Sequence, residues 1–254
     1  MSFRVTTLNL EQDHKRWPLR RPLIEAEIAR LKPDILALNE VSLPLQTART
    51  LRAFASGATG VPYSLVQQTR ANGLSEVEGE ALITTFPIVE TGNFDFRTQD
   101  IVALVARLTV AGQPIDVYVT HLYRSVGDDS LRLFQVQRLL GWIDSRSDAV
   151  HTAAVHTIVC GDFNATLDKP SAALMASRFR PTQTAPTAFT PLADDKGSVS
   201  HPYWPRMDRC IDYVWVSERL KVLASGTCFD RPSPDDASLW PSDHAGVWAD
   251  IEFG

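Results

Sequence analysis

The stretch Ile158–Thr166, IVCGDFNAT, joins an apolar, β-rich run to two polar side chains. The run before Gly161 predicts a buried strand, which the glycine interrupts just before Asp162 and Asn164. If the backbone stays extended through Phe163, the two polar side chains point the same way and the phenyl ring turns inward. A carboxylate that activates water beside an amide that donates to a phosphoryl oxygen suits phosphate chemistry. The same residue types are common in ordinary strand-ending turns, so this stretch alone leaves both interpretations open.

The length and composition of the chain predict one large folded unit. The chain has 254 residues, 44% of them hydrophobic, and no Gly/Ser/Pro-rich linker divides it. We therefore predict a single domain over residues 1–254. The net charge of -5 disfavours nonspecific attraction of nucleic acid or anionic membranes. A phosphate-bearing ligand then has to be held by local cations or by a metal.

Cysteine usage and the N-terminus bear on the compartment. The three cysteines are an odd number without metal-ligand spacing, which indicates small core residues in a reducing environment. No long apolar segment occurs, and a strand-like run begins at Phe3 without the features of a signal peptide. We expect a soluble, cytoplasmic monomer without stable membrane association.

The periodicity of apolar residues predicts alternating strands and helices in the first half of the chain and mostly strands in the second. Strands are expected at residues 3–10, 35–38, 81–85, 101–110, 115–120, 157–160 and 208–217, with a last strand within 240–251. Helices are expected at residues 22–31, 43–54 and around 136–143. Prolines between residues 181 and 205 indicate a loop long enough to be functional.

Polar side chains recur where these predicted strands end, whereas independent turns would scatter them. They are Asn9, Glu40, His121, Asp162, Asn164, Asp212, Asp243 and His244. Taken singly, each has an ordinary explanation, such as a turn-forming Asn9, a solvated Glu40 or a structural His121. The set lacks the pattern of a Ser or Cys nucleophile and the Cys/His spacing of zinc sites. Hard oxygen ligands instead favour Mg²⁺, with Mn²⁺ as an alternative, and histidines beside carboxylates indicate a phosphoryl centre.

Six short motifs spread over nearly the whole chain carry a family resemblance. In order they are Thr7–Leu10 (TLNL), Leu38–Val41 (LNEV), Thr120–Leu122 (THL), Gly161–Asn164 (GDFN), Ile211–Tyr213 (IDY) and Ser242–His244 (SDH). Each motif is weak, but the ordered set resembles the endonuclease/exonuclease/phosphatase superfamily. That superfamily includes deoxyribonucleases, abasic-site endonucleases, neutral sphingomyelinases, inositol-phosphate phosphatases and deadenylases.

The resemblance implies an α/β fold and a site at one end of it. The fold is a four-layer α/β/β/α sandwich in which helices flank two mainly antiparallel sheets. Glu40, with Asn9 and Asp243, would hold the metal directly or through water. Asp162 and Asn164 would position the attacking water and the phosphoryl oxygens.

The resemblance also implies roles for two histidines. Asp212 would orient His244, which would contact the scissile phosphate. His121 would donate to another phosphate oxygen, and Glu78 would be its orienting acid. These roles describe a centre at which water attacks a phosphate ester.

We therefore expect a Mg²⁺-dependent hydrolase of phosphodiester or phosphomonoester bonds. Nucleic acid, either DNA or RNA, is the first-guess substrate. A lipid phosphodiester or an inositol phosphate is the alternative, although no membrane-binding amphipathic helix stands out. A catalytically silent phosphate-binding domain of the same fold is the rival. The intact set of charged residues argues against that rival, because buried charges are costly without their ion.

Three side chains are predicted to bind substrate. Arg20 belongs to the basic, Trp-containing segment 13–21, which could grip a phosphate and stack a base. The alternative for this segment is a solvated helix entry with one surface-packed Trp. Trp240 precedes Asp243 by three residues, and Trp204 lies in the Pro-rich loop. Both tryptophans are expected to line the substrate groove at the mouth of the site. Alternatively, Trp240 is a core residue that closes the end of the sandwich.

Overall fold

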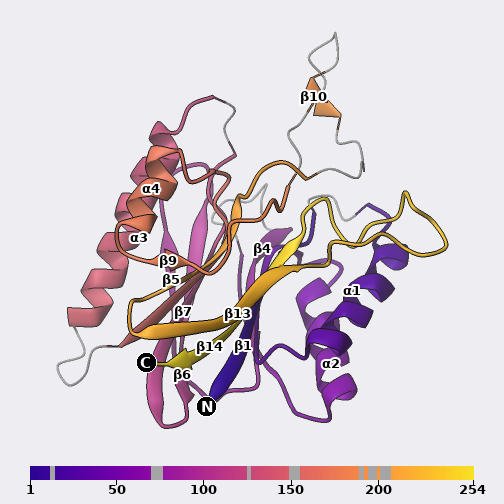
Figure 1. The fold of residues 1–254 in the computed structure, drawn as a ribbon, viewed down its shortest axis with the longest axis horizontal. Helices are drawn as coiled ribbons and strands as arrows, with labels where there is room; N and C mark the ends of the chain where they lie inside the picture. Colours follow the sequence, from indigo (N-terminus) through magenta and orange to yellow (C-terminus); the bar gives the residue numbers. More distant parts are fainter. Residues whose placement is uncertain are drawn as a thin grey trace.

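The computed structural model describes residues 1–11, 15–69, 77–124, 127–148, 155–188, 192–193, 199–200 and 207–254. Two six-stranded sheets form the centre of the molecule, and helices cover their outer faces (Figure 1). The four-layer sandwich expected from the sequence is confirmed.

The first sheet has the strand order β13-β14-β1-β2-β4-β3. These strands are β13 (Leu220–Cys228), β14 (Gly246–Phe253), β1 (Ser2–Asn9), β2 (Ile35–Ser42), β4 (Glu78–Thr84) and β3 (Ser64–Thr69). Strands β1 and β2 are parallel, and all the other neighbours in this sheet are antiparallel.

The second sheet has the order β5-β6-β7-β8-β12-β9. Its strands are β5 (Ile88–Asp95), β6 (Val102–Val110), β7 (Gln113–Thr120), β8 (His156–Asp162), β12 (Asp212–Val216) and β9 (Arg180–Pro181). Only β7 and β8 run parallel in it. Two short strands, β10 (Leu192–Ala193) and β11 (Val199–Ser200), form a separate pair.

Helices α1 (Trp17–Leu31) and α2 (Thr47–Thr59) lie on one side of the sandwich, and α3 (Ser130–Asp148) and α4 (Pro170–Ala176) on the other (Figure 1). The prediction that α1 begins near Pro22 is wrong, because the helix begins at Trp17 with Pro18 in its first turn. Proline suits that turn, where a backbone N–H has no partner within the helix. Strands β3, β5 and β13 and helix α4 were not predicted.

Alternation along the strands divides the core into layers. One set of side chains, including Val5, Val117 and Val214, packs between the two sheets. The opposite faces pack against helices, as Leu8 does against Ile24 and Ile28 of α1. Each fully buried aliphatic side chain contributes about 1.5–3 kcal/mol, so these layers fix which strand faces point inward.

The topology gathers several strand ends at one end of the sandwich. Asn9, at the end of β1, lies beside Asn39 of the parallel strand β2. In the second sheet, Asp162 at the end of β8 lies opposite Asp212 at the start of β12. Strand β14 begins at Gly246, so the chain just before it reaches the same end. Among the described residues, no helix combines the length and hydropathy needed to cross a membrane.

Candidate active site

The end of β8 is shaped by Gly161. Its φ of 133° is unfavourable for other residues, and a Cβ there would lie 1.9 Å from the carbonyl oxygen of Thr120. The backbone does not stay extended beyond this point, since Asn164 adopts a left-handed conformation with φ 49°. Its N–H donates to Asp162 Oδ1 at 2.7 Å. A tight turn, rather than strand alternation, therefore brings the two side chains together, while Phe163 is buried as expected.

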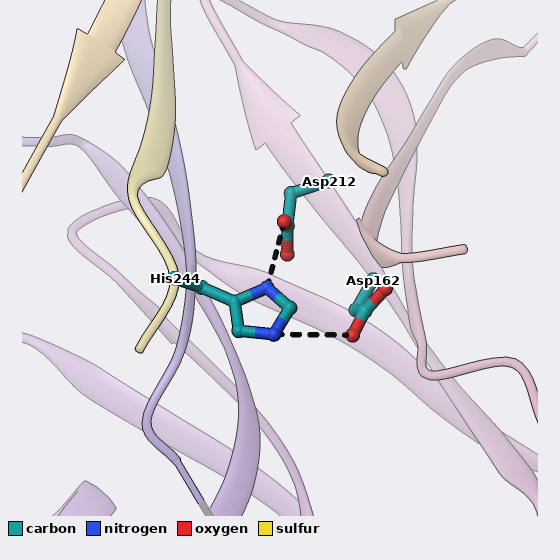
Figure 2. Close-up of side chains that lie close together, drawn as sticks. All are labelled: Asp162, Asp212 and His244. Atoms are coloured by element: carbon teal, nitrogen blue, oxygen red, sulfur yellow. Dashed lines mark hydrogen bonds and ion pairs between the residues drawn. The ribbon is translucent and has the colours of Figure 1, made fainter. Parts of the chain in front are cut away.

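Asp162, Asp212 and His244 form the centre of the site (Figure 2). His244 Nδ1 lies 2.9 Å from Asp212 Oδ2, and its other ring nitrogen, Nε2, lies 3.9 Å from Asp162 Oδ2. Both aspartates are buried. The imidazole thus bridges two carboxylates that come from neighbouring strands of the second sheet.

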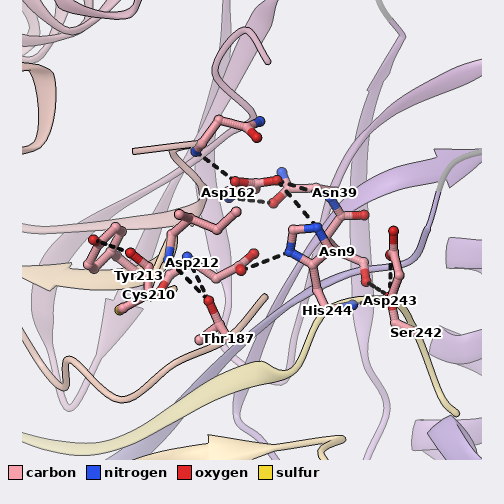
Figure 3. A network of polar contacts seen from close by, with 12 residues as sticks. Asn9, Asn39, Asp162, Thr187, Cys210, Asp212, Tyr213, Ser242, Asp243 and His244 are labelled. Atoms are coloured by element: carbon pink, nitrogen blue, oxygen red, sulfur yellow. Dashed lines mark hydrogen bonds and ion pairs between the residues drawn. The ribbon is translucent and has the colours of Figure 1, made fainter. Parts of the chain in front are cut away.

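Asn9 lies beside Asp162 (Figure 3) and joins this group to Glu40. Its Nδ2 donates to Asp162 Oδ2 and to Glu40 Oε1, both at 3.2 Å. Glu40 has a left-handed backbone with φ 55°, at a register shift between β2 and β4. Such conformations cost energy and are concentrated at functional sites, so the irregularity that points Glu40 into the site is informative.

The SDH motif lies against the end of β1. Ser242 Oγ donates to the Asn9 carbonyl at 2.6 Å and accepts the His244 N–H at 3.2 Å. Asp243 lies near enough to Glu40 for its charge to raise the pKa of that carboxyl. One serine therefore sets the positions of Asn9, Asp243 and His244 relative to one another.

His121 lies between Glu40 and Asp162. Its Nδ1 is 3.8 Å from Glu40 Oε1, and its Nε2 is 3.5 Å from Asp162 Oδ2. Asn164 Nδ2 lies 3.1 Å from the same Nε2 and donates to the Leu122 carbonyl at 2.9 Å. Glu78, predicted to orient His121, is buried and acts on Glu40, whose pKa it raises. Its orienting role stays a prediction.

Burial and mutual repulsion shift the titration of these groups. Desolvation, then the charge of Asp243, raises the pKa of Glu40 to about 8. Desolvation and the charge of Asp212 raise the pKa of Asp162 to about 7. Burial alone would lower the pKa of His244, but the surrounding aspartates outweigh it and raise that pKa well above its usual value. A protonated imidazole beside a carboxyl that titrates near neutral pH is suited to acid–base chemistry.

A divalent cation fits the Glu40 side of the site. Glu40, Asp243 and Glu78 bring three carboxyl groups close enough to oppose ionisation of Glu40, and a cation would relieve that repulsion. Carboxylate oxygens are the ligands that suit Mg²⁺. Asn9 meets Glu40 through its amide nitrogen, and its Oδ1 accepts the Glu11 N–H at 3.0 Å. The ligand atoms of Asp162, Asp212 and His244 also lie within 4.8 Å of one another. His244 Nδ1 already forms a hydrogen bond with Asp212. We therefore assign Asp162, Asp212 and His244 to acid–base chemistry and not to metal binding.

Arg20 departs from its predicted role in substrate binding. Its side chain is buried, and its Nη1 donates to the carbonyls of Leu10 and Pro241 at 3.0 and 2.8 Å. The same nitrogen lies 3.2 Å from Glu11 Oε2. A buried guanidinium can satisfy backbone carbonyls at the end of a strand, which the sequence pattern of a basic segment does not reveal. Arg20 therefore braces the site from behind instead of facing a substrate.

The two predicted aromatic contacts have different outcomes. Trp240 is half-buried, one residue before the Pro241 that Arg20 holds. Its contact with substrate stays a prediction. Trp204 lies outside the described residues.

Sequence reasoning missed three residues that surround the centre. Asn39 is buried, accepts the Asp162 N–H at 2.9 Å and donates to the Thr120 carbonyl at 3.1 Å. Thr187 is buried and accepts the N–H of Asp212. It lies in a Pro-rich stretch, and no sequence pattern there indicated a role for it. Arg209 is half-buried, and the charges of Asp162 and Asp212 oppose the lowering of its pKa by burial. Its position two residues before the IDY motif was the available signal.

Comparisons with known proteins concern the family and the fold of the chain. A family model described as the Endonuclease/Exonuclease/phosphatase family matches residues 6–244. Nocturnin of Xenopus laevis is 26% identical over 262 residues, which cover 94% of this chain and 65% of that protein. The chain thus spans less than two thirds of the length of this relative.

Solved structures show the same fold. The catalytic domain of human Nocturnin with a bound sulfate anion has a TM-score of 0.75 and 24% identity, covering 100% of this chain and 95% of that chain. A mannosyl-6-phosphatase of Bacteroides thetaiotaomicron has a TM-score of 0.76 and 19% identity, covering 99% of this chain and 100% of that chain. At these identities the likeness concerns the fold alone.

Proposed function

Because this chain belongs to the endonuclease/exonuclease/phosphatase family, whose members hydrolyse phosphate esters, we propose that it is a Mg²⁺-dependent phosphoesterase that uses an activated water. The observation that carries the proposal is the convergence of Glu40, Asn9, Asp162, Asp212 and His244 at one end of the two sheets. Carboxylates, an amide and a histidine of this arrangement supply what phosphoryl transfer requires.

Asp162 is the proposed general base. Its pKa of about 7 lets it take a proton near neutral pH, and Asn9 and the Asn164 N–H fix its two oxygens. The water oxygen forms a bond to phosphorus while its proton passes to Asp162. The ester oxygen then leaves and takes up a proton from solvent. Water held at Asp162 thereby replaces the alcohol on the phosphate.

His244 and His121 are proposed to contact the phosphoryl oxygens. The raised pKa of His244 keeps its ring protonated, with Nδ1 held by Asp212 and Nε2 directed toward Asp162. A positive donor at that position stabilises the charge that develops on the oxygens. The amide of Asn164, beside His121 Nε2, adds a neutral donor.

Glu40 and Asp243 are the proposed ligands of Mg²⁺, and Asn9 is proposed to hold the ion directly or through water. When bound there, the cation would neutralise phosphate charge and draw electrons from phosphorus. Because Glu40 titrates near pH 8 without a cation, it has to release a proton to become a ligand. Affinity for Mg²⁺ should therefore rise with pH below about 8.

We propose nucleic acid as the substrate class to test first and phosphomonoesters as the second. Arg209 supplies a half-buried cation near Asp162 and Asp212, suited to a substrate phosphate. The net charge of -5 argues for recognition at the site itself and against broad electrostatic attraction. The mannosyl-6-phosphatase of the same fold is the reason to test monoesters beside oligonucleotides.

A substrate panel with Mg²⁺ and with EDTA tests the proposal. The panel contains single-stranded DNA, duplex DNA, RNA, sphingomyelin, inositol phosphates and mannose 6-phosphate. We expect release of nucleotide or phosphate with Mg²⁺, loss of release in EDTA, and recovery when Mg²⁺ or Mn²⁺ is restored. Absence of metal-dependent turnover over the whole panel would support a silent phosphate-binding domain instead.

A further inference from the structure

Thr187 connects the segment that carries Asp212 to the segment that carries His244. It is fully buried, and its hydroxyl oxygen accepts the backbone N–H groups of Ile211 and Asp212, each at 3.1 Å. Its own carbonyl accepts the N–H of Ala245 at 2.7 Å. Figure 3 shows the Thr187 side chain beside Asp212. The hydroxyl and the carbonyl of one residue therefore hold the backbone on both sides of the Asp212–His244 contact.

Further backbone contacts of residues 187 and 188 support the connection between the two segments. The Thr187 N–H donates to the Arg209 carbonyl at 2.8 Å, and Ala188 forms isolated bridges to both Arg209 and His244. Residues 187–188 thus lie as a strap between two segments that are 35 positions apart in the chain, at Arg209 and His244. Each segment reaches the strap by backbone hydrogen bonds, which fix position more strictly than side-chain packing.

The Thr187 hydroxyl pairs with two backbone N–H groups that valine could not satisfy. Strand β12 begins at Asp212, so the N–H groups of Ile211 and Asp212 lie at the point where the sheet ladder starts. A hydroxyl oxygen has two lone pairs, and Thr187 offers one to each N–H. Valine has nearly the same shape but no acceptor, and it would leave both groups buried and unpaired.

We propose that Thr187 is a positioning residue for the Asp212–His244 pair: its hydroxyl fixes the backbone of Asp212, and its carbonyl fixes the residue after His244. This inference rests on the proposed function for its catalytic consequence. Its structural consequence, the hydrogen bond between His244 Nδ1 and Asp212 Oδ2, exists without turnover and is measured separately.

The test compares Thr187→Val and Thr187→Ser with the wild-type protein. Thr84→Val is the matched control, because Thr84 is equally buried and accepts a backbone N–H, that of Phe86 at 3.1 Å. Thr84 lies at the opposite end of β4 from Glu78. Bis(p-nitrophenyl) phosphate with Mg²⁺ is the activity probe, and thermal melting reports stability for every variant.

We expect Thr187→Val to lower kcat about 10- to 100-fold with little change in KM, because a small displacement of a catalytic pair has that effect. Thr187→Ser should restore kcat to near the wild-type value. Thr84→Val should lose stability but keep the wild-type kcat. A variant that retains full kcat after loss of the Thr187 hydroxyl would overturn the inference.

A second readout does not depend on activity. In protein labelled with ¹⁵N-histidine, the Nδ1–H proton held by Asp212 should give a low-field resonance, which His244→Gln assigns by its disappearance. We expect this resonance in the wild type, Thr187→Ser and Thr84→Val, and its loss or displacement in Thr187→Val. If Thr187→Val does not fold, Thr187→Ala, which adds no methyl group near the two N–H groups, takes its place at low temperature.

The two readouts separate failure of this inference from failure of the proposed function. A wild type that is inactive on every substrate but loses the resonance in Thr187→Val supports the positioning role and contradicts the catalytic one. A resonance unchanged in Thr187→Val and Thr187→Ala contradicts the positioning role, whatever the activity. Equal losses of kcat in Thr187→Val and Thr84→Val would assign the effect to stability and overturn the inference too.

Discussion

Glu40 has a left-handed backbone, and its carboxyl group lies near the charges of Asp243 and Glu78. We predict that Glu40→Gln abolishes stabilisation by Mg²⁺ while leaving the metal-free protein at least as stable as the wild type at pH 8. The substitution removes an anionic ligand and a repelled charge but keeps the side-chain size. Thermal melting with and without Mg²⁺ measures both effects. A saturating ligand at 100 times its Kd adds about 2.7 kcal/mol, which is easily resolved.

Glu252→Gln serves as the control for this substitution. Glu252 pairs with Lys221 at 3.0 Å, and it lies opposite Ser2, at the other end of β1 from Asn9. The control should keep the full response to Mg²⁺. A wild-type response in Glu40→Gln would remove Glu40 from the metal site.

Asp162 is bonded on both oxygens, to Asn9 and to the N–H of Asn164. We predict that Asp162→Asn lowers kcat by about 10²–10⁴-fold and changes KM much less, because it removes a proton acceptor and not a substrate contact. Steady-state kinetics on an active substrate of the panel give the two constants, and the melting temperature confirms folding. Turnover close to that of the wild type would exclude Asp162 as the base.

Individual side chains of the site were predictable from the sequence to the extent that strand ends placed them. Asp162 and Asp212 meet because β8 and β12 are paired, and His244 reaches Asp212 from the segment just before β14. The family resemblance implied this grouping. Thr187 was not predictable, since its partners are backbone groups of residues far along the chain. Arg20 was misjudged because a basic segment looks the same in sequence whether its cations face solvent or buried carbonyls.

At the scale of elements, Arg20 connects α1 to two segments of the site. We predict that Arg20→Leu lowers the free energy of unfolding by about 3–5 kcal/mol, because it leaves the buried Glu11 carboxylate without this partner. It should also weaken Mg²⁺ binding, since the Pro241 carbonyl that it holds lies two residues before Asp243. Denaturant unfolding and metal titration measure the two effects.

Arg21→Leu provides the comparison within the same helix. Arg21 is half exposed and pairs with Glu25 at 3.3 Å, an arrangement worth about 0.3–0.5 kcal/mol. The control should keep stability and Mg²⁺ affinity nearly unchanged. Similar effects from both substitutions would show that charge on α1, and not the buried contacts of Arg20, matters.

Elements with a strong apolar pattern were predicted, and edge elements were missed. Strands β2, β6 and β7 are almost wholly buried, so their sequences are continuously apolar or alternate clearly. Strands β3 and β5 lie at sheet edges and are largely accessible, with polar residues on both faces. Their pairing partners decide their conformation, and a local pattern does not contain that information. The seven-residue helix α4 is too short for a periodic signal.

At the scale of the molecule, the two sheets bring several groups with raised pKa values to one end. In the metal-free protein, burial raises the pKa of Glu40 from 4.5 to about 8 and that of Asp162 from 3.8 to about 7. The pKa of His244 is raised as well, by the aspartates around it. In each case the folded state holds a proton that the unfolded chain releases at lower pH. Stability from these groups is therefore present at low pH and is lost as pH rises through the folded values.

We predict that the free energy of unfolding of the metal-free protein falls between pH 5 and pH 8. Each such group contributes a slope of up to about 1.4 kcal/mol per pH unit. His156 opposes this trend near pH 6, because burial lowers its pKa from 6.5. The measurement is denaturant unfolding in EDTA at several pH values, in wild type and in His156→Gln, where the fall should be steeper.

Mg²⁺ and Glu40→Gln should each reduce this slope, for different reasons. The cation favours the ionised Glu40 carboxylate, so in saturating Mg²⁺ stability should fall less with pH and should exceed the metal-free value most at pH 8. Glu40→Gln removes one titrating group, so its metal-free slope should be shallower while Mg²⁺ has little further effect. Metal-free stability that rises from pH 5 to pH 8 in His156→Gln would contradict the raised pKa values. A slope that Mg²⁺ leaves unchanged would instead separate the metal from Glu40, because a cation bound elsewhere cannot neutralise that carboxylate.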